Sequence, residues 1–147
     1  MTTFNYNDGG RLSAGYQNAK AGDCVCRAIA IATNKPYQEV WDYLALHNSK
    51  QRKSKRSNNK RGETADKGIS TKRKWFNDYM LSLGFKWKPT MLIGSGCKVH
   101  LKAEELPMGV IIANVSKHFV CVIDGVIQDT YDCSRGGTRC VYGYYYK

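Results

Sequence analysis

Two cysteines open an apolar stretch of the chain, in the sequence KAGDCVCRAIAIATNKPY from Lys20 to Tyr37. Asp23 directly precedes Cys24 and is a good helix N-cap, so we expect a helix to begin at Cys24. A cysteine in the first turn of a helix has its thiolate stabilised by the positive end of the helix dipole and by backbone N–H groups that lack helical partners. Cys24 is therefore a candidate nucleophile.

A nucleophilic cysteine also requires a histidine on another element and a group that orients the histidine ring. His118 opens the run HFVCVID, and Asp129 stands in the next run, GVIQDT. Asp124-Gly125 between these runs is a strong hairpin signal, so His118 and Asp129 are expected at the same open end of a two-stranded ribbon. The carboxylate could then hold one imidazole nitrogen and leave the other for the thiol. Asp132 is the alternative orienting acid.

The other cysteines allow different interpretations. Cys26 lies about 200° around the helix from Cys24, so it is expected to pack in the core, and Cys121 in FVCVI is expected to be a small core residue of a strand. Structural zinc needs two closely spaced ligand pairs. Cys97 and His100 have such a spacing, but no second CxxC or HxxxH pair follows. The sequence therefore predicts neither a metal site nor a cofactor. The remaining alternative is a disulfide across the turn SRGGTR, between Cys133 and Cys140.

The elements that must position these residues are helices first and strands afterwards. Three helices are expected, beginning at Cys24, at Pro36, and at Ser70 or Thr71. Gly84 is placed to end the third helix. Runs of β-branched and aromatic residues then follow, separated by turn residues. This order predicts an α+β domain in which N-terminal helices pack on one face of a C-terminal antiparallel sheet.

Length and composition favour one globular domain over residues 1–147. The chain is 42% hydrophobic, which is close to the globular norm and argues against disorder. No apolar run reaches the length of a membrane span, so we expect no membrane contact. The N-terminus lacks a basic region followed by an apolar one, which predicts no secretory signal and a cytoplasmic location. In that compartment thiols are expected rather than disulfides.

The net charge of +11 is concentrated between Lys50 and Lys74, where eleven lysines and arginines face two acids. Such charge blocks are usually solvated, and we expect a basic, flexible insertion at about residues 50–70. The alternative is contact with nucleic acid or an acidic protein through counterion release and electrostatic steering. The cations available for that contact are Lys50, Arg52, Lys53, Lys55, Arg56, Lys60 and Arg61.

Two segments, GDCVCRAIAIATNKPYQEVWDYL and KHFVCVIDGVIQDTYD, resemble the papain-like cysteine peptidase superfamily. They most resemble its small members that process bacteriocin leaders, and related phage-encoded proteins with an NDC…RA opening. The resemblance covers residues 17–46 and about 106–143. It implies a papain-like fold and a triad in which Cys24 is the nucleophile.

The resemblance also implies roles for other residues. His118 and Asp129 match the histidine that opens a strand and the aspartate on the following strand. The family places a glutamine six residues before the cysteine as an oxyanion donor. This chain has Asn18 at that spacing and Gln17 beside it.

The function implied is a cysteine-dependent hydrolase or acyl-transfer enzyme of the peptidase, isopeptidase or deamidase type. It would act on a protein or peptide substrate through a thioester acyl-enzyme, without a cofactor. If the chain is phage-encoded, its location would be the host cytoplasm. Two alternatives stay open: a non-enzymatic papain-like shell whose basic loop binds nucleic acid or an acidic host protein, and a zinc-stabilised nucleic-acid binder.

Overall fold

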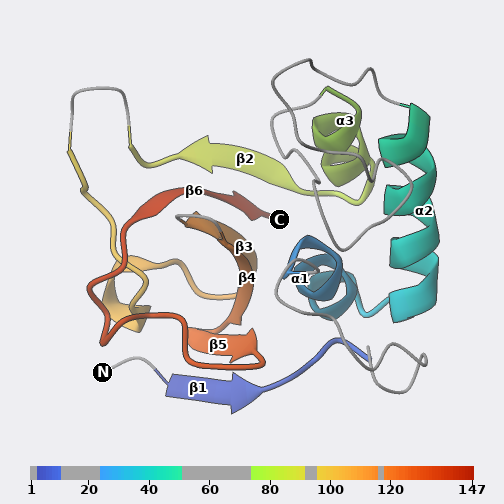
Figure 1. The fold of residues 1–147 in the computed structure, drawn as a ribbon. Coiled ribbons are helices and arrows are strands. Elements are labelled where there is room, and N and C mark those ends of the chain that lie inside the picture. The colour runs from blue at the N-terminus through green and yellow to red at the C-terminus, as the bar shows by residue number, and fades with distance from the viewer. Residues whose placement is uncertain (1–2, 11–23, 51–73, 92–95, 116–117) are drawn as a thin grey trace.

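The computed structural model describes residues 3–10, 24–50, 74–91, 96–115 and 118–147 (Figure 1). These segments contain three α-helices: α1 (Cys24–Thr33), α2 (Tyr37–Lys50) and α3 (Lys74–Ser82). None of these helices is long and apolar enough to cross a membrane. The helices appear in the order that the sequence predicts.

The helix ends follow from local sequence. α1 begins at Cys24, as expected. Pro36 precedes α2 instead of being its first residue, and its carbonyl accepts from the N–H of Val40 at 3.3 Å. α3 ends at Ser82, and Gly84, two residues later, has a φ of 93°, with which the N–H of Phe85 closes the helix end on the carbonyl of Met80 at 3.1 Å. The predicted caps of the first and third helices, Asp23 and Ser70 or Thr71, lie outside the described residues.

One sheet of six strands lies beside the helices. In chain order the strands are β1 (Thr3–Tyr6), β2 (Lys86–Pro89), β3 (Val110–Val115), β4 (His118–Ile123), β5 (Val126–Asp129) and β6 (Val141–Tyr146). Their order across the sheet is β1-β5-β4-β3-β6-β2. A short 3₁₀ helix, η1 (Ala103–Glu105), lies between β2 and β3.

The prediction of an antiparallel sheet is wrong for one strand. β1 runs parallel to β5, with Tyr6 opposite Asp129, and this makes the sheet mixed. The other strand pairs are antiparallel. β1 has only four residues, TFNY, and carries two polar ones, so the sequence offered too short a pattern to reveal a strand.

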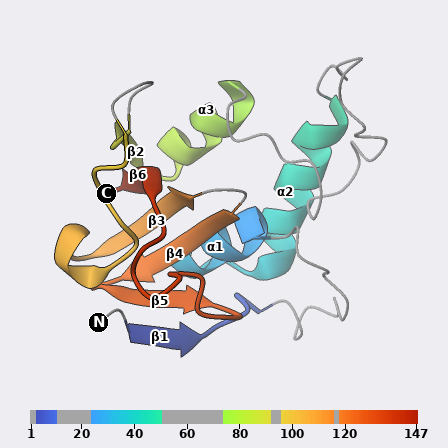
Figure 2. The same ribbon diagram turned by 60° about the vertical axis from the view of Figure 1, so that its left-hand side comes forward.

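The helices cover one face of the sheet, and loops cover the other (Figures 1 and 2). On the helical face, Phe76 of α3 is fully buried and meets the ring of Phe119 edge-on at 5.9 Å between centroids. α1 contributes Ile29 to the same core. A second core on the opposite face contains Val120 and Ile127 from the sheet together with Leu101, Leu106 and Cys133 from the connecting segments.

The hairpin between β4 and β5 forms where the sequence predicts it. Asp124 and Gly125 have φ values of 50° and 80°, and Ile123 pairs with Val126 across them. Positive φ at both turn residues is the conformation that matches the twist of the flanking strands. The turn therefore fixes the pairing of β4 with β5.

A disulfide joins Cys97 to Cys140, which corrects the expectation of thiols throughout. Their Cα atoms are 5.8 Å apart, and the bond ties the segment after β2 to the start of β6. Cys140 is thus paired with Cys97, and Cys133 is a free thiol. The alternative disulfide across SRGGTR is therefore absent, and Cys97 is not a zinc-type partner of His100, whose ring contacts Glu105 at 3.2 Å.

We expect Gly125→Ala to destabilise the protein more than Gly84→Ala does. Both glycines have positive φ, so alanine costs about 1 kcal/mol at either position through the backbone alone. At Gly125 the new Cβ would also lie 2.8 Å from Cβ of Ala103, whereas no described atom lies within 4 Å at Gly84. Urea unfolding should show losses of about 1 kcal/mol for Gly84→Ala and about 2–3 kcal/mol for Gly125→Ala. Equal losses would contradict the close approach of η1 to the turn.

We expect the Cys97–Cys140 bond to survive purification without reductant and to stabilise the fold. The bridged residues are 43 positions apart, and a loop of that length stabilises by up to about 4 kcal/mol in the chain-entropy account. Peptide mapping after alkylation should find this pair linked and the other four cysteines labelled once the chain is unfolded. Reduction should lower the denaturation midpoint of the wild type and leave that of a Cys97→Ser/Cys140→Ser variant unchanged.

Candidate active site

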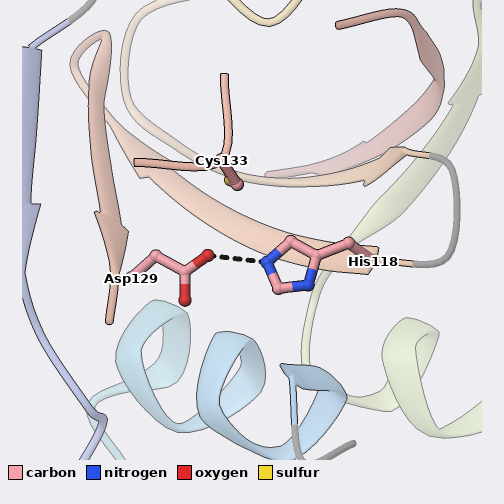
Figure 3. A group of neighbouring side chains, drawn as sticks. All are labelled: His118, Asp129 and Cys133. Atoms are coloured by element: carbon pink, nitrogen blue, oxygen red, sulfur yellow. Dashed lines mark hydrogen bonds and ion pairs between the residues drawn. The ribbon is translucent and has the colours of Figure 1, made fainter. Parts of the chain in front are cut away.

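The β4–β5 hairpin brings His118 and Asp129 together. His118 is the first residue of β4 and Asp129 the last of β5, and Nε2 of His118 lies 2.6 Å from Oδ2 of Asp129 (Figure 3). Their side chains are 8% and 3% exposed. The alternative acid, Asp132, instead accepts from the N–H and the hydroxyl of Ser134 at 3.0 and 2.7 Å. Of the two acids, Asp129 is the one that orients the His118 ring.

Asp129 has two further partners besides His118. Its Oδ1 accepts from Nη2 of Arg27 at 3.1 Å and from the backbone N–H of Thr130 at 2.7 Å. Burial raises the pKa of Asp129, but the hydrogen bond and charge of His118, the Thr130 N–H and the Arg27 cation together hold it below its ordinary value. Asp129 is therefore an ionised carboxylate at neutral pH.

Sequence reasoning missed Arg27 as part of the site. The signal was present, because Arg27 interrupts the apolar run CVCRAIAIA on a helix most of whose other residues pack in the core. An arginine at such a position is buried, here with 6% of its side chain exposed, and a buried cation requires an anionic partner. What the sequence could not show is which carboxylate it meets.

His118 is held as an imidazolium. Burial lowers the pKa of His118, but hydrogen bonds with Asp129, Cys133 and Cys24, together with the charge of Cys24, raise it to about 12. Since Asp129 takes Nε2, Nδ1 is the ring nitrogen left available to a thiol.

Two thiols interact with His118 from different elements. Cys24 lies at the start of α1, is partly exposed, and belongs to a helix that packs directly on β4. Cys133 follows β5 and is 1% exposed. Its Sγ lies within 4.8 Å of a ring nitrogen of His118 and of a carboxylate oxygen of Asp129. In the view of Figure 3, Cys133 and the helices lie on opposite sides of the His118–Asp129 pair.

The surroundings of Cys133 keep its thiol neutral. Burial raises its pKa, and the charge of Asp129 raises it too, against the opposing effect of His118. Sequence reasoning considered Cys133 only as a disulfide partner. No local pattern could have placed it here, because the loop that carries it turns back only after β5 has ended.

Two other free cysteines lie in the core, as expected. Cys26 is fully buried, with its Sγ 3.8 Å from the carbonyl of Tyr37. Cys121 is also fully buried, and burial raises its pKa to about 12. Both thiols therefore act as small packing groups.

Tyr131 is an exposed side chain that lies beside His118, where a substrate could contact it. Its ring lies 5.5 Å from the His118 ring between centroids, tilted by 48°, and half of the residue is exposed to solvent. It therefore covers one side of His118 while remaining open to a molecule that approaches from outside.

The residues that could hold a cation are His118, Asp129 and Cys133, which form the metal-type cluster in the described part of the chain. Contacts that these side chains already make disfavour metal binding. Nε2 of His118 and Oδ2 of Asp129 hold each other, and Oδ1 of Asp129 holds the Arg27 cation. A metal would have to break the first contact and tolerate the second.

The remaining residues of the predicted sites lie outside the described residues. These are the oxyanion candidates Asn18 and Gln17 and, in the basic insertion, Arg52, Lys53, Lys55, Arg56, Lys60 and Arg61. Lys50 is the last residue of α2, but its side chain is likewise outside the description.

Comparisons with known proteins return no match to a family model, to a curated protein or to a solved structure. The interpretation of the site therefore depends on its geometry and chemistry.

We expect the His118–Asp129 pair to stabilise the fold most between about pH 4.5 and 6. Folding lowers the pKa of Asp129 from 3.8, so its contribution is present above that value and lost as the pH falls. Folding raises the pKa of His118 from 6.5, so its contribution is complete below 6.5 and is lost as the pH rises towards about 12.

The measurement is the difference in unfolding free energy between the wild type and Asp129→Asn from pH 4 to 9. The difference should be largest near pH 5–6 and should fall by about 1 kcal/mol per pH unit above pH 7. Asp132→Asn is the matched control, because Asp132 bonds to Ser134 and not to His118. A constant Asp129→Asn difference across this range would show that the pair is not ionic.

Proposed function

We propose that the protein is a papain-like cysteine-dependent acyl-transfer enzyme with Cys24 as its nucleophile. The observation that carries the proposal is the buried contact of 2.6 Å between Nε2 of His118 and Oδ2 of Asp129, beside a helix that begins at Cys24. An oriented imidazolium next to a thiol at a helix N-terminus is the arrangement that activates a cysteine at neutral pH. The three helices that precede five of the six strands, and the hairpin that carries the two partners, also support a papain-like arrangement.

Between the two thiols near His118, Cys24 is the better nucleophile. Attack on a substrate carbonyl needs a thiolate that solvent and substrate can reach. Cys24 is partly exposed and lies at the positive end of α1, whereas Cys133 is buried with a raised pKa. Cys133 therefore packs behind the pair and does not react.

The reaction follows from these roles. The Cys24 thiolate forms a bond to the carbonyl carbon, and the backbone N–H groups at the start of α1 donate to the oxyanion that develops. As the C–N bond breaks, His118 gives its proton to the leaving amine, and a thioester remains on Cys24. Water or a second amine then attacks the thioester, His118 takes up the proton, and the Cys24 thiolate is released. Asp129 holds the ring in place throughout.

The substrate class is a peptide or protein amide, and the outcome depends on the groups that reach the thioester. Water gives a peptidase, an isopeptidase or a deamidase, according to which amide is attacked, and an amine gives acyl transfer. Asn18 or Gln17 would add a side-chain donor to the oxyanion, as the resemblance to papain-like peptidases implies.

We expect iodoacetamide at about pH 6 to alkylate Cys24 at least about ten-fold faster than any other cysteine of the folded protein. Peptide mapping by mass spectrometry identifies the labelled site. His118→Gln should slow the labelling of Cys24 by a similar factor, because it removes the imidazolium. Cys133→Ala is the matched control and should leave the rate unchanged, since that thiol is neutral.

An activated ester tests the acyl-enzyme directly. p-Nitrophenyl acetate should release nitrophenol in a burst and leave an acetyl group on Cys24, and Cys24→Ala should show neither. Equal alkylation of all free cysteines, or faster labelling of Cys133, would contradict the assignment and favour a non-enzymatic binding protein. In that case a steep dependence of nucleic-acid binding on salt would point to the basic insertion.

A further inference from the structure

The helix that carries Cys24 also carries the cation that holds the acid of the triad. Arg27 is three residues after Cys24 on α1, about one helical turn away. Its Nη2 lies 3.1 Å from Oδ1 of Asp129, and the other oxygen of that carboxylate lies 2.6 Å from Nε2 of His118. The side chains of Arg27 and Asp129 are 6% and 3% exposed, so water screens this contact little.

The charges around His118 balance only when Arg27 is counted. The titratable or charged groups that meet His118 and Asp129 in the described residues are Cys24 and Arg27 from α1 and Tyr131 and Cys133 from the segment after β5. Burial and the charge of Asp129 raise the pKa of the Cys133 thiol, so that thiol is neutral at neutral pH. With Cys24 as a thiolate, two anions face two cations. Without Arg27, the thiolate would leave the buried group with one net negative charge.

We infer that Arg27 is a positioning residue that lets Cys24 and Asp129 be anionic together, and so sets the pH range over which Cys24 reacts. This inference rests on the proposed role of Cys24 as the nucleophile. Arg27 does not touch the reacting atoms and acts through Asp129. Because it sits one turn after Cys24, it also fixes the start of α1 relative to the end of β5.

A purely structural role would give a different result from this electrostatic one. Loss of a structural anchor lowers the reactivity of Cys24 at every pH without moving its pH dependence. Loss of a nearby cation disfavours every anion close to it, so the pH at which Cys24 becomes reactive must rise. For buried charges several ångströms apart, the expected rise is about one pH unit.

The experiment follows the rate of Cys24 alkylation by iodoacetamide against pH in the full-length protein. Arg27→Met removes the cation and keeps most of the side-chain volume. The pH midpoint of Cys24 alkylation in this variant should rise by about one pH unit. Arg27→Lys keeps a cation, so its midpoint should move by less than half as much. Lys35→Met is the matched control, because Lys35 pairs with Glu39 at 3.7 Å and does not meet Asp129. Its midpoint should stay that of the wild type.

Two results would overturn the inference while leaving the proposed function intact. One is a wild-type midpoint in a folded Arg27→Met variant, and the other is an equal shift in Arg27→Met and Arg27→Lys. If the wild type itself shows no selective reaction of Cys24, the proposed function and the inference are both wrong. The pH profile thus separates the two claims.

A second pair of variants covers the case in which Arg27→Met does not fold. These variants are Asp129→Asn alone and Asp129→Asn combined with Arg27→Met. Both lack the Asp129 carboxylate, so neither buries that carboxylate without its cation partner. In the Asp129→Asn variant, Arg27 is still present and still acts on Cys24 and His118. Adding Arg27→Met to it should therefore raise the pH midpoint of alkylation above that of Asp129→Asn, by about half a pH unit or more. An unchanged midpoint between these two variants would overturn the inference.

Discussion

Asp129 is a carboxylate that is almost wholly removed from water, and a charge in that position must be matched by partners that the fold holds in place. Its partners come from three parts of the chain: His118 from the start of β4, Arg27 from α1, and the N–H of its own neighbour Thr130. The ionic contacts form only when the helix and the hairpin are docked in one way. The same constraint that keeps the charge buried therefore also places Cys24 beside His118.

The pairing of β4 with β5 places His118 where it can contact the buried Asp129 carboxylate. A shift of one residue between the two strands would turn Asp129 to the opposite face of the sheet, where it could not meet His118. The two-residue turn at Asp124 and Gly125 prevents that shift, since both residues adopt the positive φ of a tight hairpin. On its outer side β5 pairs with β1, which is the edge strand of the sheet.

The sequence was most informative where structure depends on neighbours in the chain. The start of α1 at Cys24, the cap of α3 at Gly84 just after its end, and the turn at Gly125 all depend on a few adjacent residues, and each could be predicted. The contact of His118 with Asp129 was predictable too, because one tight turn separates their strands. These are local rules that a single sequence displays.

The features that the sequence did not reveal depend on contacts between distant segments. Cys97 meets Cys140 across 43 positions, and β1 reaches β5 from the opposite end of the chain. Arg27 could be recognised as a cation that needs a partner, but not as the partner of Asp129. In each case several pairings satisfy the same local pattern, and only the packed structure selects one of them.

Four free cysteines in the described residues share one chemistry, and their surroundings give them different properties. Cys26 and Cys121 are fully buried in the main core, and burial raises the pKa of Cys121 to about 12. Burial raises the pKa of Cys133, and the charge of the nearby Asp129 carboxylate raises it further, against the effect of the His118 imidazolium. Cys24 meets the imidazolium from the side of α1, with solvent access and the start of a helix behind it. Its reactivity would then depend less on the thiol than on the arrangement of His118, Asp129 and Arg27 around it.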